Sequence, residues 1–289
     1  MPEPPVLRFA PSPNGPLHLG HALSALPGFE MARRLGGRFL LRIEDIDTER
    51  SREEHVAGIL EDLAWLGIAW EEPVLRQSQR FAVYAQAAQL LEAQGLLYPC
   101  FATRSEIAEA AAAGPLDPEG APLYPGLHKR PSQAEIEARI AAGGRYALRL
   151  HLDRAIAAVQ RRLGGRPPAF TELDEGGAPH RVEADPERWG DTVILRKDVP
   201  ASYHLAVVVD DAAQGVSHVV RGGDLYAATD LQRLLQVVLG LPEPVYHHHR
   251  LVNDPQGRKL SKSARDTALA SLRAAGVSAV DIRRQLGLP

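Results

Sequence analysis

The first part of the chain alternates short apolar runs with a longer segment of helical composition. Residues 6–10 and 39–43 are largely apolar without regular polar alternation, which is typical of strands buried on both faces of a parallel sheet. Between them, residues 22–35 favour a helix that ends at Gly36, and Pro27 predicts a kink or a late helix start. Strand, helix and strand in this order predict a βαβ unit.

Two amphipathic helices are predicted next. Residues 51–54 form a capping-box pattern, and apolar residues at helical spacing continue to Leu66 before Gly67 ends the helix. A second helix is predicted over 81–94. We interpret both as structural elements.

The pattern changes over residues 98–189. Two Ala-rich helical segments flank a loop rich in proline and glycine at 114–131, and a second such loop is predicted at 164–179. The strand-like pattern resumes only at 192–195, so this region is predicted to be an insertion between the two halves of a sheet.

The remaining apolar runs are expected to complete that sheet. Strands are predicted at 203–211, 216–221 and 245–252, and a helix at 227–239. Three adjacent histidines, 247–249, lie in the last strand. An ordinary strand is favoured over a metal site, because three adjacent side chains of a strand cannot converge on one ion.

These elements predict an α/β fold, a Rossmann-like doubly wound parallel sheet with an inserted α+β subdomain. After Ser263, 289 − 263 = 26 residues remain, fewer than the ~50 that a domain usually needs. The predicted divisions are the first half of the main domain at 1–97, the insertion at 98–190, the second half at 191–250, and a lysine-containing loop with a short helical tail at 251–289.

Composition narrows the class of protein. A hydrophobic content of 45% is enough for a packed core, and a net charge of −3 excludes a generally basic nucleic-acid coat. The single cysteine, Cys100, excludes an intramolecular disulfide and fits a reducing cytoplasm. Because no apolar run approaches the ~20 residues of a membrane span, we expect a cytoplasmic protein that has no membrane partner.

Candidate chemistry begins with His18-Leu-Gly-His21 at a predicted helix start. Unpaired N–H groups and the helix dipole favour anions there, and phosphate is the expected guest. Gly20 leaves room for a flat ring or a sugar close to the backbone. The alternative is a chance pattern on an ordinary helix.

Acidic residues follow the strand at 39–43, where ligands of open α/β sheets usually bind. A solvated acidic loop is the alternative, because such loops are common and carry no motif of their own. The residues are Glu44, Asp45, Asp47 and Glu49.

A second motif, Lys259-Leu-Ser-Lys-Ser263, lies near the end of the chain. Together, the two motifs, their order and the proline-rich lead-in to the first resemble the catalytic core of class I aminoacyl-tRNA synthetases. The resemblance implies that ATP, with Mg²⁺ held by its phosphates, activates an amino acid as an adenylate. It implies ATP binding by His18, Gly20, His21, Lys259 and Lys262, of which His18, His21 and Lys262 would be catalytic.

Within this class the chain resembles the glutamyl branch. The matching segments are 8–12, 42–45, Tyr203 and 220–224. A glutamate substrate offers two carboxylates and one ammonium group. The resemblance implies that Arg8 and Arg221 bind carboxylates, that Glu44 binds the ammonium, that Ser12 and Tyr203 give neutral hydrogen bonds, and that Phe9, Ala10 and Pro11 complete the glutamate site.

Two departures narrow the resemblance further. Full-length glutamyl-tRNA synthetases usually carry asparagine and histidine where this chain has Val207 and Leu225. With the expected lack of an anticodon-binding domain, this resembles the truncated glutamyl-Q tRNA(Asp) synthetases over nearly the whole chain. That family implies a monomer that activates L-glutamate without tRNA and transfers it to queuosine in the anticodon of tRNA(Asp).

A third departure concerns zinc. The family often holds zinc through three cysteines and a tyrosine, whereas this chain keeps Cys100 and Tyr124 and has His128 in the last position. A structural zinc site usually needs four ligands, so we expect no bound zinc.

Other functions stay open on sequence grounds. A minimal glutamyl-tRNA synthetase would charge the 3′ end of tRNA(Glu), and a small nucleotidyltransferase would share only the first motif. A degenerate synthetase fragment that binds tRNA is the non-enzymatic alternative, but it predicts loss of motifs that are intact here.

Overall fold

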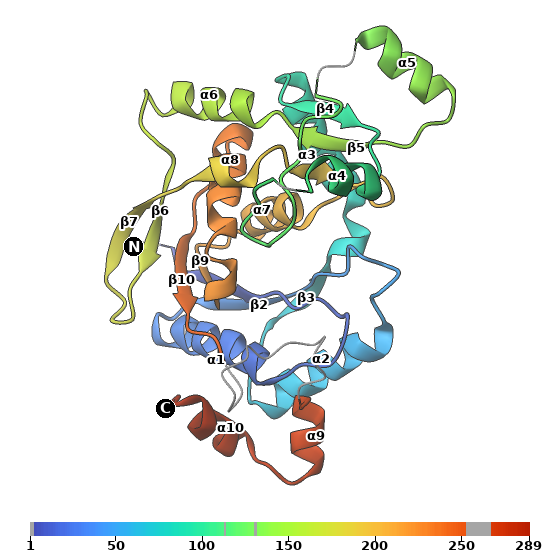
Figure 1. Ribbon diagram of the computed structural model, residues 1–289. Helices are drawn as coiled ribbons and strands as arrows, with labels where there is room; N and C mark the ends of the chain where they lie inside the picture. The colour runs from blue at the N-terminus through green and yellow to red at the C-terminus, as the bar shows by residue number, and fades with distance from the viewer. Residues whose placement is uncertain (1–2, 113, 130–131, 253–266) are drawn as a thin grey trace.

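The computed structural model describes residues 3–112, 114–129, 132–252 and 267–289 (Figure 1). Its strands are β1 (Val6–Phe9), β2 (Arg38–Ile43), β3 (Glu71–Arg76), β4 (Leu97–Cys100), β5 (Ala147–Leu150), β6 (Ala169–Leu173), β7 (Pro179–Glu183), β8 (Val193–Leu195), β9 (His218–Gly222) and β10 (Val245–His249).

The described helices divide into α-helices and short 3₁₀ turns. The α-helices are α1 (Leu19–Arg34), α2 (Glu53–Trp65), α3 (Phe81–Ala93), α4 (Arg104–Ala110), α5 (Gln133–Ala141), α6 (Leu152–Arg162), α7 (Tyr203–Ala213), α8 (Ala228–Leu239), α9 (Leu269–Ala274) and α10 (Ala279–Leu286). The turns are η1 (Gln77–Gln79), η2 (Pro186–Trp189) and η3 (Gly223–Leu225).

A seven-stranded sheet in the order β3-β2-β1-β9-β10-β6-β7 organises the molecule. Its first six strands in that order run parallel, and β7 runs antiparallel to β6. Helices α1 and α2 lie on one side of the sheet, with α7 and α8 on the other (Figure 1). The predicted α/β fold class and the βαβ unit of β1, α1 and β2 are confirmed.

Helix α1 begins early in spite of its internal proline. Its first residue is Leu19, after His18 as the N-cap, and Pro27 lies inside the helix without delaying its start. The predicted capping box at 51–54 is wrong: α2 begins at Glu53 after Arg52, which makes no side-chain cap. The carboxylate of Glu53 instead pairs with Arg76 on β3, at 2.5 Å.

The predicted strand at 203–211 is wrong, because this segment is the helix α7. Every residue from His204 to Asp211 is buried, so an unbroken apolar run suits a helix that packs on all sides. Periodicity alone cannot distinguish such a helix from a buried strand.

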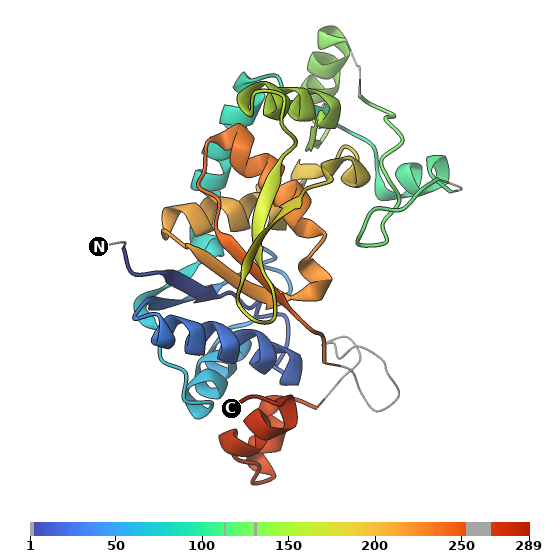
Figure 2. The ribbon, with the colours of Figure 1, turned by 90° about the vertical axis from the view of Figure 1, so that its left-hand side faces the viewer.

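The predicted loop at 164–179 is also wrong, since it contains β6 and the start of β7. Strand β6 pairs with β10 through Glu172 and Tyr246, which joins this hairpin to the large sheet (Figure 2). Strand β8 lies where a strand was expected, but it pairs with β5 in a separate antiparallel sheet, β4-β5-β8. The domain boundaries at 98 and 190 stay a prediction.

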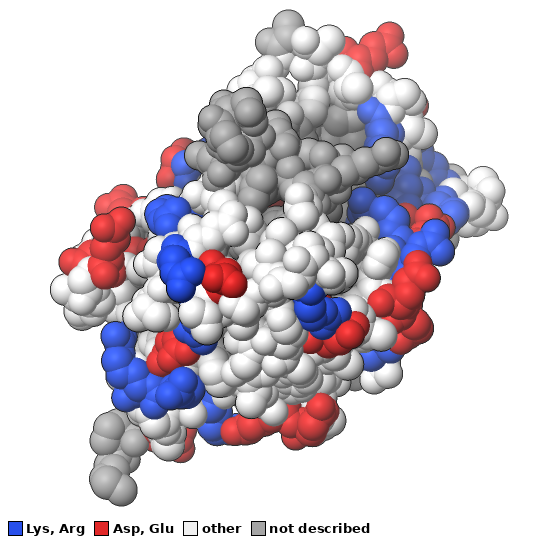
Figure 3. Space-filling view, turned by 90° about the horizontal axis from the view of Figure 1, so that it is seen from below, with Lys and Arg blue, Asp and Glu red and all other residues white. Residues whose placement is uncertain are grey.

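The short helical tail packs against the first half of the chain. Leu269 and Ile282 are buried in one cluster with residues of α1 and α2, and Arg283 pairs with Glu30 at 2.9 Å. The face seen from below carries acidic and basic side chains around a broad uncharged area, with no dominant sign (Figure 3). Among the described residues, no helix is long and apolar enough to cross a membrane.

Candidate active site

A cavity of about 730 Å³ opens at the carboxyl ends of β1, β2, β9 and β10. Ligands of doubly wound sheets bind at this edge, where the strand order changes direction. Its wall contains every described residue to which the sequence assigned a role in binding or catalysis: Arg8, Phe9, Ala10, Pro11, Ser12, His18, Gly20, His21, Glu44, Tyr203 and Arg221. Lys259 and Lys262 lie outside the described residues.

His18 and His21 form a reciprocal cap at the start of α1. The Nδ1 atom of His18 accepts from the Gly20 backbone N–H, and Nδ1 of His21 accepts from the His18 backbone N–H, both at 3.1 Å. Since Nδ1 is an acceptor in each neutral ring, the proton lies on Nε2. Each imidazole therefore carries its N–H donor on Nε2.

The structure gives Gly20 a role that the sequence did not predict. A Cβ at this position would lie 2.9 Å from Cε1 of His18, closer than side chains tolerate. The residue therefore leaves space for the imidazole of His18 and not only for a ligand.

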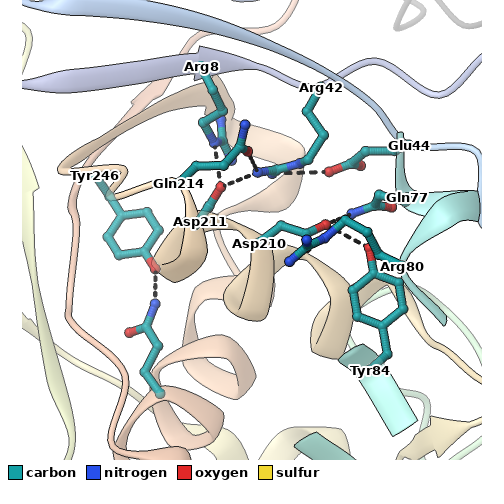
Figure 4. A network of polar contacts seen from close by, with 11 residues as sticks. Arg8, Arg42, Glu44, Gln77, Arg80, Tyr84, Asp210, Asp211, Gln214 and Tyr246 are labelled. Carbon is teal, nitrogen blue, oxygen red and sulfur yellow. Dashed lines mark hydrogen bonds and ion pairs between the residues drawn. The ribbon is translucent and has the colours of Figure 1, made fainter. Parts of the chain in front are cut away.

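Two arginines share one buried carboxylate behind the cavity (Figure 4). The Asp211 Oδ1 atom accepts from Nε of Arg8 at 3.1 Å and from Nη1 of Arg42 at 2.7 Å. Burial opposes ionisation of Asp211, but the two guanidinium groups outweigh it and hold the pKa of this carboxyl below its usual value. Arg8 is thus fixed by a counter-charge that the fold supplies.

The neighbouring Asp210 locks α7 to the α3 region. It accepts from Gln77 at 2.9 Å, from Arg80 at 2.7 Å and from Tyr84 at 2.8 Å (Figure 4). Buried charges need such hydrogen bonds to be tolerated. This second carboxylate holds the helix that presents Asp211.

The acidic loop after β2 divides into distinct roles. Glu44 is held by the Pro11 carbonyl, which accepts from its backbone N–H at 3.0 Å, and by Arg42 at 3.3 Å. Burial raises the pKa of Glu44, although the charges of Arg42 and Arg8 oppose the shift. Asp45 instead accepts from the backbone N–H and the hydroxyl of Ser78, each at 2.8 Å, and is structural.

Arg221 is held by neutral groups. Its Nε donates to Nε2 of His248 at 3.0 Å, and Nη2 donates to the hydroxyl of Thr229 at 2.8 Å. Its Nη1 is buried and has no hydrogen-bond partner among the described residues. A buried donor in this state is expected to meet a ligand acceptor.

The two positions that narrowed the resemblance differ in their contact with the cavity. Leu225 lines it, whereas Val207 is buried in α7. Tyr203 lines the wall as well, and burial raises the pKa of its phenol, so the group is neutral. Asp47 and Asp224, which lie in segments that the sequence marked as candidates, also line the wall. The sequence assigned no site role to several other wall residues: Asn14, Ser24, Ile46, Arg50, Gln77, Glu119, Val193, Arg196, Ser202, His249, Leu251 and Val252.

Cys100, Tyr124 and His128 lie together but do not fit a metal ion. The thiol of Cys100 donates to the Tyr124 hydroxyl at 3.3 Å, which also accepts from the His128 backbone N–H at 2.7 Å. Nε2 of His128 lies 3.1 Å from Arg139. Across the described residues no group of three or more His, Cys, Asp or Glu side chains could hold a metal.

Comparison with known families adds to this geometry. A model of the catalytic domain of class I tRNA synthetases, E and Q type, matches residues 6–286. A glutamyl-Q tRNA(Asp) synthetase of Rhodobacter capsulatus is 47% identical, covering 98% of this chain and all of that protein. The chain belongs to the class I tRNA synthetases.

The predicted resemblance is therefore confirmed at the level of the family. Members of this class are ligases that use ATP with Mg²⁺. A protein of Nitrosococcus oceani named glutamate–tRNA ligase 2 is 40% identical to this class I synthetase. The match covers 93% of this chain and 56% of the Nitrosococcus protein.

Solved structures of class I synthetases have the same fold as this chain. Glutamate-tRNA synthetase from Elizabethkingia anophelis superposes with a TM-score of 0.72 and 27% identity, over 90% of this synthetase and 53% of that chain. A methionyl-tRNA synthetase from Mycobacterium tuberculosis, at 15% identity and a TM-score of 0.56 over 94% of this chain and 62% of that one, shares the fold.

Proposed function

We propose that this chain activates L-glutamate with ATP, without tRNA, and transfers the glutamyl group to queuosine in the anticodon of tRNA(Asp). One observation carries the choice of acceptor. The glutamyl-Q tRNA(Asp) synthetase of Rhodobacter capsulatus is 47% identical over 98% of this chain, whereas the glutamate–tRNA ligase of Nitrosococcus oceani is 40% identical over 93% of it.

The first step requires alignment more than chemical participation by the protein. A glutamate carboxylate oxygen attacks the α-phosphorus of ATP, the bond to pyrophosphate breaks, and glutamyl-adenylate forms. The Nε2–H groups of His18 and His21, at the positive end of α1, would donate to phosphate oxygens. Lys259 and Lys262, assigned by sequence, would add cationic stabilisation as charge develops.

The glutamate side of the proposal is supported by the charges in the wall. Nη1 of Arg221, for which the described segments provide no hydrogen-bond partner, is suited to a substrate carboxylate. Glu44, whose pKa burial raises in spite of the nearby Arg42, would gain a further counter-charge from the ammonium group of the substrate. Arg8, already paired with Asp211, would add charge while its position is fixed.

In the second step a cyclopentene hydroxyl of queuosine attacks the acyl carbon of the mixed anhydride. The bond to AMP breaks, an ester forms, and the hydroxyl proton passes to solvent. The protein needs mainly to hold the hydroxyl near the anhydride.

ATP–pyrophosphate exchange in the absence of tRNA tests the activation step. Exchange that depends on glutamate, with no response to glutamine or aspartate, is the expected result. Lack of glutamate-dependent exchange would overturn the proposed activation.

Transfer of radiolabelled glutamate tests the acceptor. We expect labelling of tRNA(Asp) that contains queuosine and none of tRNA(Asp) that lacks it, with the label mapped to the anticodon by nuclease digestion. Equal labelling of both, or label at the 3′ end of tRNA(Glu), would instead support a minimal glutamyl-tRNA synthetase.

A further inference from the structure

The β6–β7 hairpin brings a buried carboxylate toward the glutamate side of the cavity. Glu172 on β6 pairs with Tyr246 of β10, and Figure 2 shows the hairpin running along that strand. Both carboxylate oxygens contact His248. One accepts from its backbone N–H at 2.8 Å and the other lies 2.9 Å from its ring Nδ1.

The opposite side of the same imidazole contacts Arg221. Nε of Arg221 donates to Nε2 of His248 at 3.0 Å, and the Thr229 hydroxyl lies 3.3 Å from the same Nε2. A guanidinium group can only donate, so Nε2 must be the acceptor and the ring proton must lie on Nδ1. That proton is donated to Glu172, which selects the tautomer.

We propose that Glu172 and His248 are positioning residues that fix Arg221 in the orientation in which it receives a substrate carboxylate. Nε and Nη2 of Arg221 are both held by acceptors, and only Nη1 has none among the described residues. This inference rests on the proposed function, because it takes glutamate to be the substrate. It adds two residues that do not line the cavity.

A carboxylate is required at position 172 because both of its oxygens must accept. In Glu172→Gln, one of the two atoms becomes an NH₂ donor. If this donor faces the backbone N–H of His248, two donors oppose each other. If it faces Nδ1, the ring must carry its proton on Nε2, directly against the Nε–H of Arg221.

Steady-state pyrophosphate exchange tests the consequence for the substrate. Glu172→Gln should raise KM for glutamate by about tenfold or more, the effect of a misplaced charge-assisted hydrogen bond, with KM for ATP within about twofold of wild type. Glu243→Gln is the matched control. Glu243 accepts from the adjacent Thr171 N–H and pairs with Arg233, so it supports the same hairpin without contacting His248.

Two histidine variants separate positioning from packing. His248→Gln can present an amide oxygen near the place of Nε2 and should retain much of the glutamate affinity. His248→Asn can donate to Glu172 but does not reach Arg221, so it should behave like Glu172→Gln. Equal effects of both variants on KM for glutamate, or none from either, would contradict the proposal.

The tautomer can be measured without any activity. ¹⁵N NMR of histidine-labelled protein, with the signals of residue 248 assigned from their loss in His248→Gln, should show a protonated Nδ1 and an unprotonated Nε2. The opposite tautomer would overturn the inference. If wild type shows no glutamate-dependent exchange, the proposed function fails, whereas the same NMR spectrum of Glu172→Gln, compared with wild type, still decides whether Glu172 sets the tautomer.

Discussion

Arg8 and Arg221 are both buried in the wall of one cavity, but the fold holds them differently. Arg8 shares the carboxylate of Asp211 with Arg42, so its charge is balanced within the protein. Arg221 bonds to neutral His248 and Thr229, and its Nη1 has no partner in the described part of the chain. The charge of Arg8 is thus balanced within the protein, whereas the proposed glutamate carboxylate would supply a counter-charge for Arg221. The resemblance in sequence implied the same role, carboxylate binding, for both arginines.

Loss of the shared carboxylate should have the largest effect. Asp211→Asn leaves buried Arg8 without its ion-pair partner and Arg42 with only its longer contact to Glu44, and breaking a buried ion pair costs about 3–5 kcal/mol. Urea unfolding should show a decrease of this size in the free energy of unfolding. Glu71→Gln, which removes an exposed partner of Arg38, should leave the curve nearly unchanged. If the unfolding curve of Asp211→Asn coincides with that of wild type, the fold around Arg8 and Arg42 does not depend on charge balance.

Acid should destabilise the fold through His204, a residue of α7 whose pKa burial and the charge of Arg221 lower, before it affects Asp211 beside Arg8. Burial, assisted by the charge of Arg221, lowers the pKa of His204 from 6.5 to about 4. Its contribution to stability is therefore complete above pH 6.5 and is lost as the pH falls toward 4, by about 3 kcal/mol at about 1.4 kcal/mol per pKa unit. Asp211, whose pKa is lowered, loses its contribution only below the usual carboxylate range.

His204→Phe measures this difference. The ring packs edge-on against Trp189, so phenylalanine keeps the packing without the titration. Urea midpoints taken between pH 7 and 4 should fall less steeply for this variant than for wild type. Parallel profiles would show that His204 is not held neutral by the fold.

Replacement of Arg221 should affect activity without loss of stability. Arg221→Gln should lower kcat/KM for glutamate in pyrophosphate exchange by about 10- to 150-fold, which corresponds to 1.5–3 kcal/mol for hydrogen bonds to a charged group. The free energy of unfolding should stay constant or rise, since the buried cation that is removed forms no ion pair with any described residue. Arg166→Gln, at an exposed position, is the control. A wild-type kcat/KM would exclude Arg221 from glutamate binding.

The smallest expected effect comes from a matched pair of neutral acceptors. Thr229→Val removes the acceptor of Nη2 of Arg221 and should raise KM for glutamate severalfold, about 1 kcal/mol. Gln214→Met removes an acceptor of Arg42 and should leave that KM unchanged, because Asp211 and Glu44 remain. Equal changes in KM for glutamate in the two variants would show that the contacts of Arg221 and those of Arg42 contribute alike to glutamate binding.

Local sequence patterns were sufficient to predict a structure where all of its elements lie within one short segment. The run from Arg8 to His21 contains a strand, a proline-rich turn and a helix start, and each depends on neighbours close in the chain. Most of those residues line the cavity, and the order of the elements was enough to predict the fold class.

Only the tertiary structure decided which side chains hold Arg8 and Arg221 in place. Asp211 lies on a helix that was expected to be a strand, because the apolar run of α7 is buried on every side and shows no amphipathic period. Glu172 lies in a segment expected to be a loop, and its partner His248 follows 76 residues later. Such pairs form where distant strands align, and no local pattern records which distant residues will meet.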